Sequence, residues 1–170
     1  MPLGKVWPTA ISETSATYTD LAASLNELRV ENGNTYRLVK AGAAIANRLL
    51  CMPFTTEIDT DGDDFGLYVT VTGANTSLVV GANTTGGTIT SGHYFWMQID
   101  GLCWLTATGD GTMTDGARLM PAADGEALDF VGDAAENCFC GISLEDTSGS
   151  DPYYARVLLV TGGHCDYKET

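Results

Sequence analysis

The clearest hydrophobic pattern in the chain lies between Gly92 and Pro121, where apolar and polar residues alternate with a period of two. Over residues 94–100 the alternation includes several aromatic side chains, which is typical of a strand whose two faces meet different surroundings. Gly101 interrupts the pattern, and the alternation resumes over residues 102–107. This second part is either a separate strand or a bent continuation of the first. Glycine-rich turns at 109–111 and 115–116 then precede a short strand at 118–120.

Similar but shorter patterns predict strands along most of the chain. Residues 28–31 and 35–40 flank Asn32-Gly33, a dipeptide that favours the type I′ turn of a β-hairpin. Further strands are predicted at 67–72, from 77 to 80, at 88–90, 127–131, 138–143 and 153–160, with a loop at 122–126. Residues 41–50 are alanine-rich and fit a helix or a strand, and leucines at helical spacing allow a short helix near residues 17–28. The expected fold is all-β: a sandwich or small barrel of short antiparallel strands, with an extended N-terminal arm and at most short helices.

The first residues differ in composition from the rest. Residues 1–26 are predicted to form the N-terminal arm, and residues 27–170 the β-rich domain. The start of the arm is rich in Ser, Thr and Pro, with isolated apolar anchors at Val6, Trp7 and Ile11. Such a segment suits an extended arm that lies on its own body or on a neighbour. We therefore predict these three residues as partner-binding, because Trp is a favoured interface anchor; a Trp folded back on its own domain is the equal alternative.

Charge and hydropathy exclude several classes of function. The chain has 8 basic and 22 acidic residues, a formal charge of −14, so it repels phosphate backbones and no nucleic-acid partner is expected. No apolar run reaches the roughly 18 residues of a membrane span, so no membrane partner is expected. The first residues lack the apolar stretch of a signal peptide. Together with five cysteines, an odd number, this predicts free thiols in a reducing cytosol.

Residues that could carry chemistry are few. The acidic loop Asp59–Asp64 fails the calcium-loop pattern, which needs Gly at position 6 and an acid at position 12, although an adventitious cation there stays open. The Cys138-x-Cys140 spacing is a poor match to zinc sites. Only two histidines are present, and no nucleophile elbow or phosphate-binding glycine loop occurs. We expect no enzyme activity, no cofactor and no metal site.

Two groups of segments resemble known proteins. Residues 32–46 (NGNTYRLVKAGAAIA) resemble a strand and Ala-rich segment of tailed-phage virion proteins. Residues 101–105, 111–119, 141–146 and 154–159 follow an order similar to that of phage head decoration proteins. The resemblance implies a capsid decoration or cementing protein that is assembled in the host cytoplasm and sits on the outside of the capsid of the virion. It also implies the major capsid protein as partner, contacted through the arm, and a homotrimer.

Two other functions compete with this interpretation. One is a ligand- or glycan-binding β-sandwich module on a virion, either a host-recognition tip or a tail-associated protein, in which Tyr94, Trp96, Tyr153 and Tyr154 would stack on sugars. The other is a hydrolase, which the missing nucleophile and base disfavour.

Overall fold

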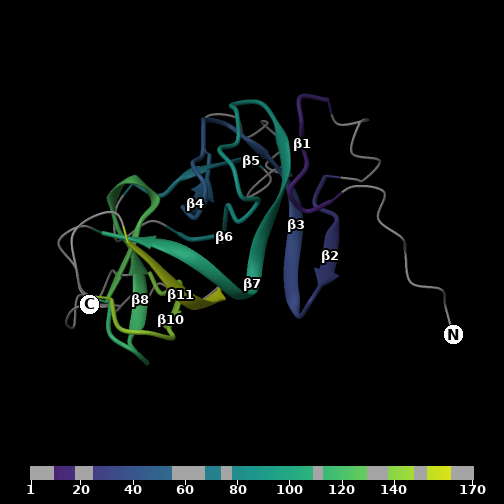
Figure 1. Ribbon diagram of the computed structural model, residues 1–170. Helices are drawn as coiled ribbons and strands as arrows, with labels where there is room; N and C mark the ends of the chain where they lie inside the picture. The colour runs from purple at the N-terminus through teal and green to yellow at the C-terminus, as the bar shows by residue number, and fades with distance from the viewer. Residues whose placement is uncertain are drawn as a thin grey trace, which may run out of the picture.

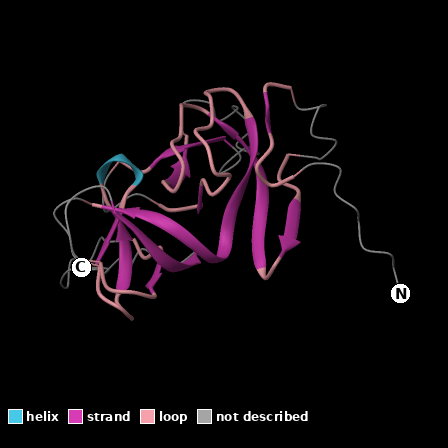
Figure 2. Ribbon diagram, viewed as in Figure 1, coloured by secondary structure: helices cyan, strands magenta, loops and turns pink. Residues whose placement is uncertain are grey.

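The computed structural model describes residues 10–17, 25–54, 68–73, 78–108, 113–129, 138–147 and 153–161. Figures 1 and 2 show these residues as strands and connecting loops, with a single turn of 3-10 helix at Ala123–Gly125. The strands are β1 Thr14–Ser15, β2 Leu28–Glu31, β3 Asn34–Ala41, β4 Leu50–Pro53, β5 Tyr68–Val71, β6 Gly81–Ala82, β7 Tyr94–Ala107, β8 Arg118–Pro121, β9 Ala127–Asp129, β10 Gly141–Ser143 and β11 Tyr153–Val160.

The long strand β7 organises the molecule. It runs through the centre of Figure 1, where it bends. Gly101, with a φ of 100°, lies where its pairing changes from β3 to β11 and marks the bend. Before the bend, residues 94–100 pair with β3, from Lys40 opposite Tyr94 to Thr35 opposite Asp100. After the bend the partner is β11, in a register that continues to Tyr153 opposite Ala107. Of the two predicted forms of this segment, the bent continuation is therefore the observed one.

The strand pairings close two circuits that share β7. One runs β7–β6–β4–β5–β3 and back to β7, and the other runs β7–β9–β8–β10–β11 and back to β7. Each circuit is a small barrel-like ring, so the all-β sandwich or barrel prediction is confirmed. The expectation of purely antiparallel strands is wrong at two places, because β3–β5 and β7–β9 are parallel. A ring of five strands cannot alternate direction throughout, so each ring needs one parallel pair.

Each ring has its own apolar core. The core of the first ring gathers Val39, Ile45, Val69, Phe95 and Met97, all fully buried, with several smaller side chains. The core of the second ring is built on residues such as Leu105, Leu119, Val157 and Leu159, and it also takes in Leu50 of β4 and Ala82 of β6. Since β7 contributes inward-facing side chains to both cores, it fixes the position of one ring against the other.

Several local predictions are confirmed. Asn32 and Gly33 have φ values of 52° and 81°, as a type I′ turn requires, and they join β2 to β3. Ile89 forms an isolated antiparallel bridge with Ile45, so of the predicted strand 88–90 this one residue is paired, outside the regular strands.

Other boundaries are wrong. Residues 78–80 are not a strand; Val80 makes one backbone hydrogen bond to Cys51, and β6 begins only at Gly81. The predicted loop at 122–126 contains the 3-10 turn, where Asp124 has a φ of 59°. The predicted strand 138–143 is regular only over β10, because the ladder with β11 starts at Gly141. Leu28 lies in β2 and not in a helix, whereas residues 18–24 of the predicted helix lie outside the described residues.

Candidate functional site

The bend of β7 creates the main irregularity of the surface. Gly101 has a φ of +100°, and a Cβ at this position would lie 2.2 Å from Oδ1 of Asn34. That same oxygen accepts a hydrogen bond of 2.8 Å from the backbone N–H of Leu102. Only glycine allows this close approach of β7 to the start of β3, and the bend turns the following residues toward a hollow.

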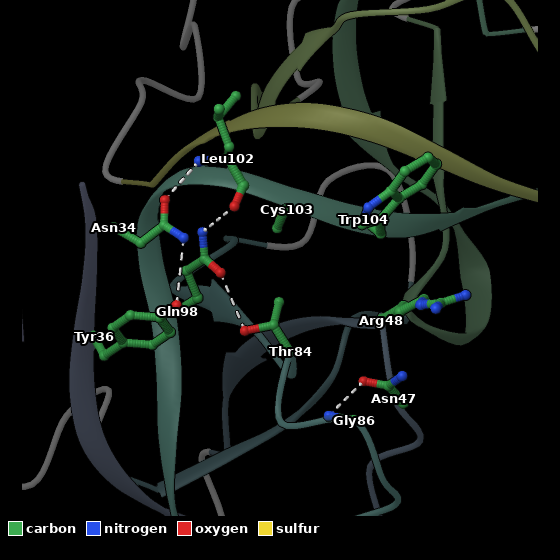
Figure 3. Close-up of a pocket in the computed structure, with 10 residues that line it drawn as sticks. All are labelled: Asn34, Tyr36, Asn47, Arg48, Thr84, Gly86, Gln98, Leu102, Cys103 and Trp104. Atoms are coloured by element: carbon green, nitrogen blue, oxygen red, sulfur yellow. Dashed lines mark hydrogen bonds between the residues drawn. The ribbon is translucent and has the colours of Figure 1, made fainter. Parts of the chain in front are cut away.

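The hollow has a volume of about 290 Å³ and is open to solvent (Figure 3). Its lining comes from β3, β7 and two loops, 42–49 and 83–93. The lining residues are Asn34, Tyr36, Asn47, Arg48, Thr84, Gly86, Gln98, Leu102, Cys103 and Trp104. They combine amides, hydroxyls, one guanidinium and an indole, and none of them is acidic.

Side-chain amides build the floor of the hollow. Gln98 is 1% exposed, and its Nε2 donates to the carbonyl oxygens of Asp100 at 3.3 Å and Leu102 at 3.1 Å. Its Oε1 accepts from the hydroxyl of Thr84 at 3.1 Å. The Nδ2 of Asn34 donates to the hydroxyl of Tyr36 at 3.3 Å. Because every polar atom of Gln98 is paired in this way, the floor is fixed without a ligand.

A buried asparagine holds the two loops of the rim together. Asn83 is fully buried, and its Nδ2 donates to the carbonyl oxygens of Ile45, Ala46 and Gly87 at 3.0, 3.0 and 2.9 Å. Its Oδ1 accepts from both the N–H and the hydroxyl of Thr85. A separate bond of 3.1 Å joins the N–H of Gly86 to Oδ1 of Asn47 across the rim. These hydrogen bonds add to the packing of Ile45 and Ile89, which lie in the same apolar core, and together they keep the relative position of the loops.

Arg48 is the only charged residue of the lining. It has a φ of 68°, a left-handed conformation that is unfavourable for a residue with a long side chain. Its guanidinium lies 4.0 Å from the ring centre of Tyr154, a cation–π contact. Among the described residues its side chain makes no ion pair, so the N–H groups of its guanidinium remain available.

The outer face of β7 beyond the bend is apolar and exposed. Leu102 is 55% exposed, Trp104 47% and Tyr154, on the neighbouring β11, 43%. Between them, Cys103 points inward, and burial raises the pKa of its thiol to about 12. The thiol is therefore protonated at neutral pH and is not a nucleophile.

Of the three residues predicted to bind a partner, the structure describes only Ile11. Val6 and Trp7 lie outside the described residues. Ile11 is partly buried and packs against the cluster of Tyr36, Leu38 and Trp96, so this part of the arm lies on its own domain. Just after it, β1 pairs with the start of β7.

The prediction that Trp96 stacks on a sugar is wrong. Trp96 is fully buried, because the guanidinium of Arg29 covers it at 5.7 Å and the arm packs beside it. Tyr94 and Tyr153 are partly buried and only Tyr154 is exposed. Neither Trp104 nor Arg48 was predicted as a site residue. The signal for Trp104 was an aromatic residue on the face of β7 opposite to its core-facing Cys103 and Leu105, whereas nothing in the sequence marked Arg48.

The cysteines also differ from the prediction. Cys51, Cys103 and Cys140 are free and buried, as expected for core residues. Cys138 is buried too, but it is disulfide-bonded, so the prediction of free thiols is wrong there; its partner lies outside the described residues. The acidic loop Asp59–Asp64 is likewise outside them. Within the described ranges, no group of three His, Cys, Asp or Glu residues could hold a metal ion, and no helix is long and apolar enough to cross a membrane.

Comparisons with known proteins identify a similar fold but no sequence family. No family model matches the sequence, and no curated protein matches it. Among solved structures, the fold is similar to the crystal structure of the head fiber gp8.5 N base of bacteriophage phi29. The TM-score is 0.52 and the sequence identity 13%, and the match covers 79% of this chain and 98% of that chain.

Proposed function

We propose that the chain is a structural protein of a tailed-phage virion that binds the outer surface of the head as a decoration protein. The observation that carries this proposal is the fold similarity, because the matched protein is the base of a phage head fiber and almost its whole length is covered. The segments that resemble head decoration proteins point to the same particle. The partner is the lattice of the major capsid protein, and the protein acts there as a homotrimer.

The end of the first ring offers surface for attachment. β2 is the last strand in the order of the sheet and has only β3 as a neighbour among the described strands. Its outward side chains are apolar, with Leu28 53% and Val30 71% exposed. An edge strand that is paired on one side only and exposes apolar residues is suited to a protein partner, since isolated proteins usually protect such edges. This edge, together with Val6 and Trp7 of the arm, forms the proposed contact with the capsid.

The arm is tested by a truncation that spares its folded part. Removing residues 1–9 leaves Ile11 and β1 in place, so the domain keeps its packing on Tyr36 and Trp96. We expect the truncated protein to fold normally and to lose most of its binding to purified heads that lack it, as measured by cosedimentation. Unchanged occupancy on the heads would remove the arm from the contact.

Two point variants separate attachment from folding. Trp7→Ala should weaken binding to heads without changing the melting temperature of the isolated protein. Ile11→Ala should lower that melting temperature instead, because Ile11 packs on its own domain. Light scattering of the purified protein tests the trimer, and a monomer at all concentrations would contradict it. Cementing itself is measured as a rise in the disruption temperature of the heads when the protein is added.

A further inference from the structure

We propose that the hollow beside the bend of β7 is a saccharide-binding site, separate from the surface that attaches the protein to the head. The site takes one sugar ring of an oligosaccharide. The ring lies against the indole of Trp104, and its oxygen atoms accept hydrogen bonds from Arg48 and Asn47. Three observations carry this assignment: an exposed aromatic wall, unused donors on the rim, and a rim that is rigid before any ligand arrives.

The aromatic wall is exposed for a structural reason. Trp104 sits on the outer face of β7, where no described strand covers it, and it is 47% exposed beside Leu102. An indole is large and rigid, and it combines an apolar face with one N–H donor. The apolar C–H face of a sugar ring can stack on such a surface, while its hydroxyl groups stay directed toward the polar rim. Figure 3 shows the indole at one end of the hollow, with Arg48 and Asn47 below it.

The rim supplies donors that the protein does not use. Oδ1 of Asn47 already accepts from Gly86, but its Nδ2 group makes no hydrogen bond among the described residues. The guanidinium of Arg48 lies over the ring of Tyr154, a contact that uses none of its N–H groups as hydrogen-bond donors to an ion-pair partner. Planar amides and guanidinium groups present two donors side by side, which matches neighbouring hydroxyl oxygens or a carboxylate of a sugar.

The rim is held in its binding geometry by buried hydrogen bonds. Two bonds from Asn83, to the carbonyl oxygens of Ile45 and Ala46, fix the backbone just before Asn47 and Arg48, and a third ties it to Gly87 of the other loop. The backbone N–H of Arg48 donates to the carbonyl oxygen of Asn83 at 2.7 Å, and this clamp keeps the left-handed φ of Arg48. Strained residues held by their surroundings occur preferentially at functional sites. A preformed rim lowers the entropy cost of binding, which matters for a small ligand.

Other ligand classes fit the hollow less well. A hard metal ion or an ammonium group is bound best where carboxylates are present, and the lining has none. A polyphosphate or nucleic acid needs several cations, whereas the hollow has Arg48 alone in a protein of formal charge −14. With about 290 Å³, the hollow is at the lower end of small-molecule sites, which are roughly 300–1,000 Å³, and this suits a single ring.

The test uses the full chain and a panel of immobilised oligosaccharides in two sets, one neutral and one that contains uronic acids. We expect binding to members of at least one of the two sets. The affinities are then measured by calorimetry with the soluble oligosaccharide. Trp104→Ala and Arg48→Ala should each weaken binding about tenfold or more, as for central contacts of a binding site. Added salt should weaken binding only to the oligosaccharides that contain uronic acids, since only there does Arg48 face a carboxylate.

Matched variants control for nonspecific effects. Leu78→Ala removes an exposed apolar side chain elsewhere, and Arg118→Ala removes another arginine stacked on an aromatic ring, that of Phe139. Both should bind the saccharide as the unchanged protein does. Trp104→Ala should also keep its binding to heads, which separates this site from the proposed attachment. The proposal is overturned if the folded protein binds neither set of oligosaccharides, or if Trp104→Ala binds them as the unchanged protein does. It is also overturned if Trp104→Ala dissociates the oligomer instead.

Discussion

The two halves of β7 have the same backbone form but opposite surroundings. In the first half, Phe95, Trp96 and Met97 are fully buried and Gln98 nearly so, which means that both faces of the strand are covered. In the second half, Cys103 and Leu105 are buried while the residues that alternate with them, Leu102 and Trp104, are exposed. The arm and β2 supply the extra cover of the first half, and no described element does so for the second.

This difference separates stability from recognition within one strand. A tryptophan in the first half is part of a core, so its loss is felt by the whole fold. A tryptophan in the second half stabilises little, and its exposed ring is available to a ligand. The same residue type, eight positions apart, therefore has two different roles because of what packs on it.

The largest effect is expected for Trp96→Ala. Trp96 is fully buried between Arg29 and Leu38, and removing a buried aromatic side chain typically costs 3–5 kcal/mol. We expect a loss of about 3–5 kcal/mol in the free energy of unfolding, measured in urea. A loss below about 1 kcal/mol would mean that the first half is not a core.

Gly101→Ala tests the bend that separates the halves. The new Cβ would contact Asn34 in a backbone conformation that only glycine adopts without strain. Strain and crowding together should cost about 3 kcal/mol. Gly73→Ala is the control, because Gly73 has open space around its Cβ position and should change stability little. Equal melting temperatures for the two variants would show that the bend needs no glycine.

Asn83→Ala probes the polar clamp of the rim. The substitution removes the donor to three carbonyl groups, of which that of Ile45 keeps the backbone N–H of Ile89 as a second donor, so we expect a loss of about 2 kcal/mol in unfolding free energy. Asn83→Asp keeps the acceptor for Thr85 but also loses the donor. A similar loss in both variants assigns the effect to the three donated bonds, and full stability of Asn83→Asp would contradict this assignment.

Alkaline pH should weaken the core that lies behind the exposed half. The pKa of Cys103 rises from 9.0 to about 12 on burial, so the folded state holds this proton more tightly than the unfolded state does. Its contribution is complete below pH 9 and is lost as pH rises toward 12. At pH 10 the titration of this one thiol lowers the free energy of unfolding by about 1 kcal/mol. The stability of Cys103→Ala should therefore fall less between pH 8 and pH 10 than that of the unchanged protein. Parallel pH curves for the two proteins would contradict the assignment.

The smallest effect is expected for Trp104→Ala. Because nearly half of this side chain is exposed, the free energy of unfolding should change by no more than about 0.5 kcal/mol. Compared with Trp96→Ala under the same conditions, it measures directly how differently the two halves are packed. A loss as large as that of Trp96→Ala would show that Trp104 belongs to a core.

Much of the fold could be predicted from local patterns. The period-two alternation located β7 and β11, and the Asn32-Gly33 turn located the hairpin of β2 and β3 with its turn type. These features depend on neighbouring residues in the chain. The two parallel pairs and the closure of two rings could not be predicted, because they depend on which distant strands meet.

The candidate site was less predictable. Alternation shows that a strand has two faces, but not whether the second face is covered, so Trp96 was taken as exposed and Trp104 was overlooked. The hollow depends on contacts between Asn83 and two loops that lie far apart in the sequence. The polar residues involved are common in loops, and nothing in their spacing indicates that they meet.

The sharing of β7 by both rings has a consequence for how the polypeptide is made. β3 can pair with β2 and β5 earlier, but its partner in β7 is present only when residues 94–100 have been synthesised, and the second half of β7 waits for β11. Neither ring can close around its core before this strand has been translated on the ribosome, and the second ring also needs β11. Such distant pairings are slow to form, and the emerging chain exposes apolar segments for that time. Production of this protein in a foreign host should therefore profit from slow translation and abundant chaperones.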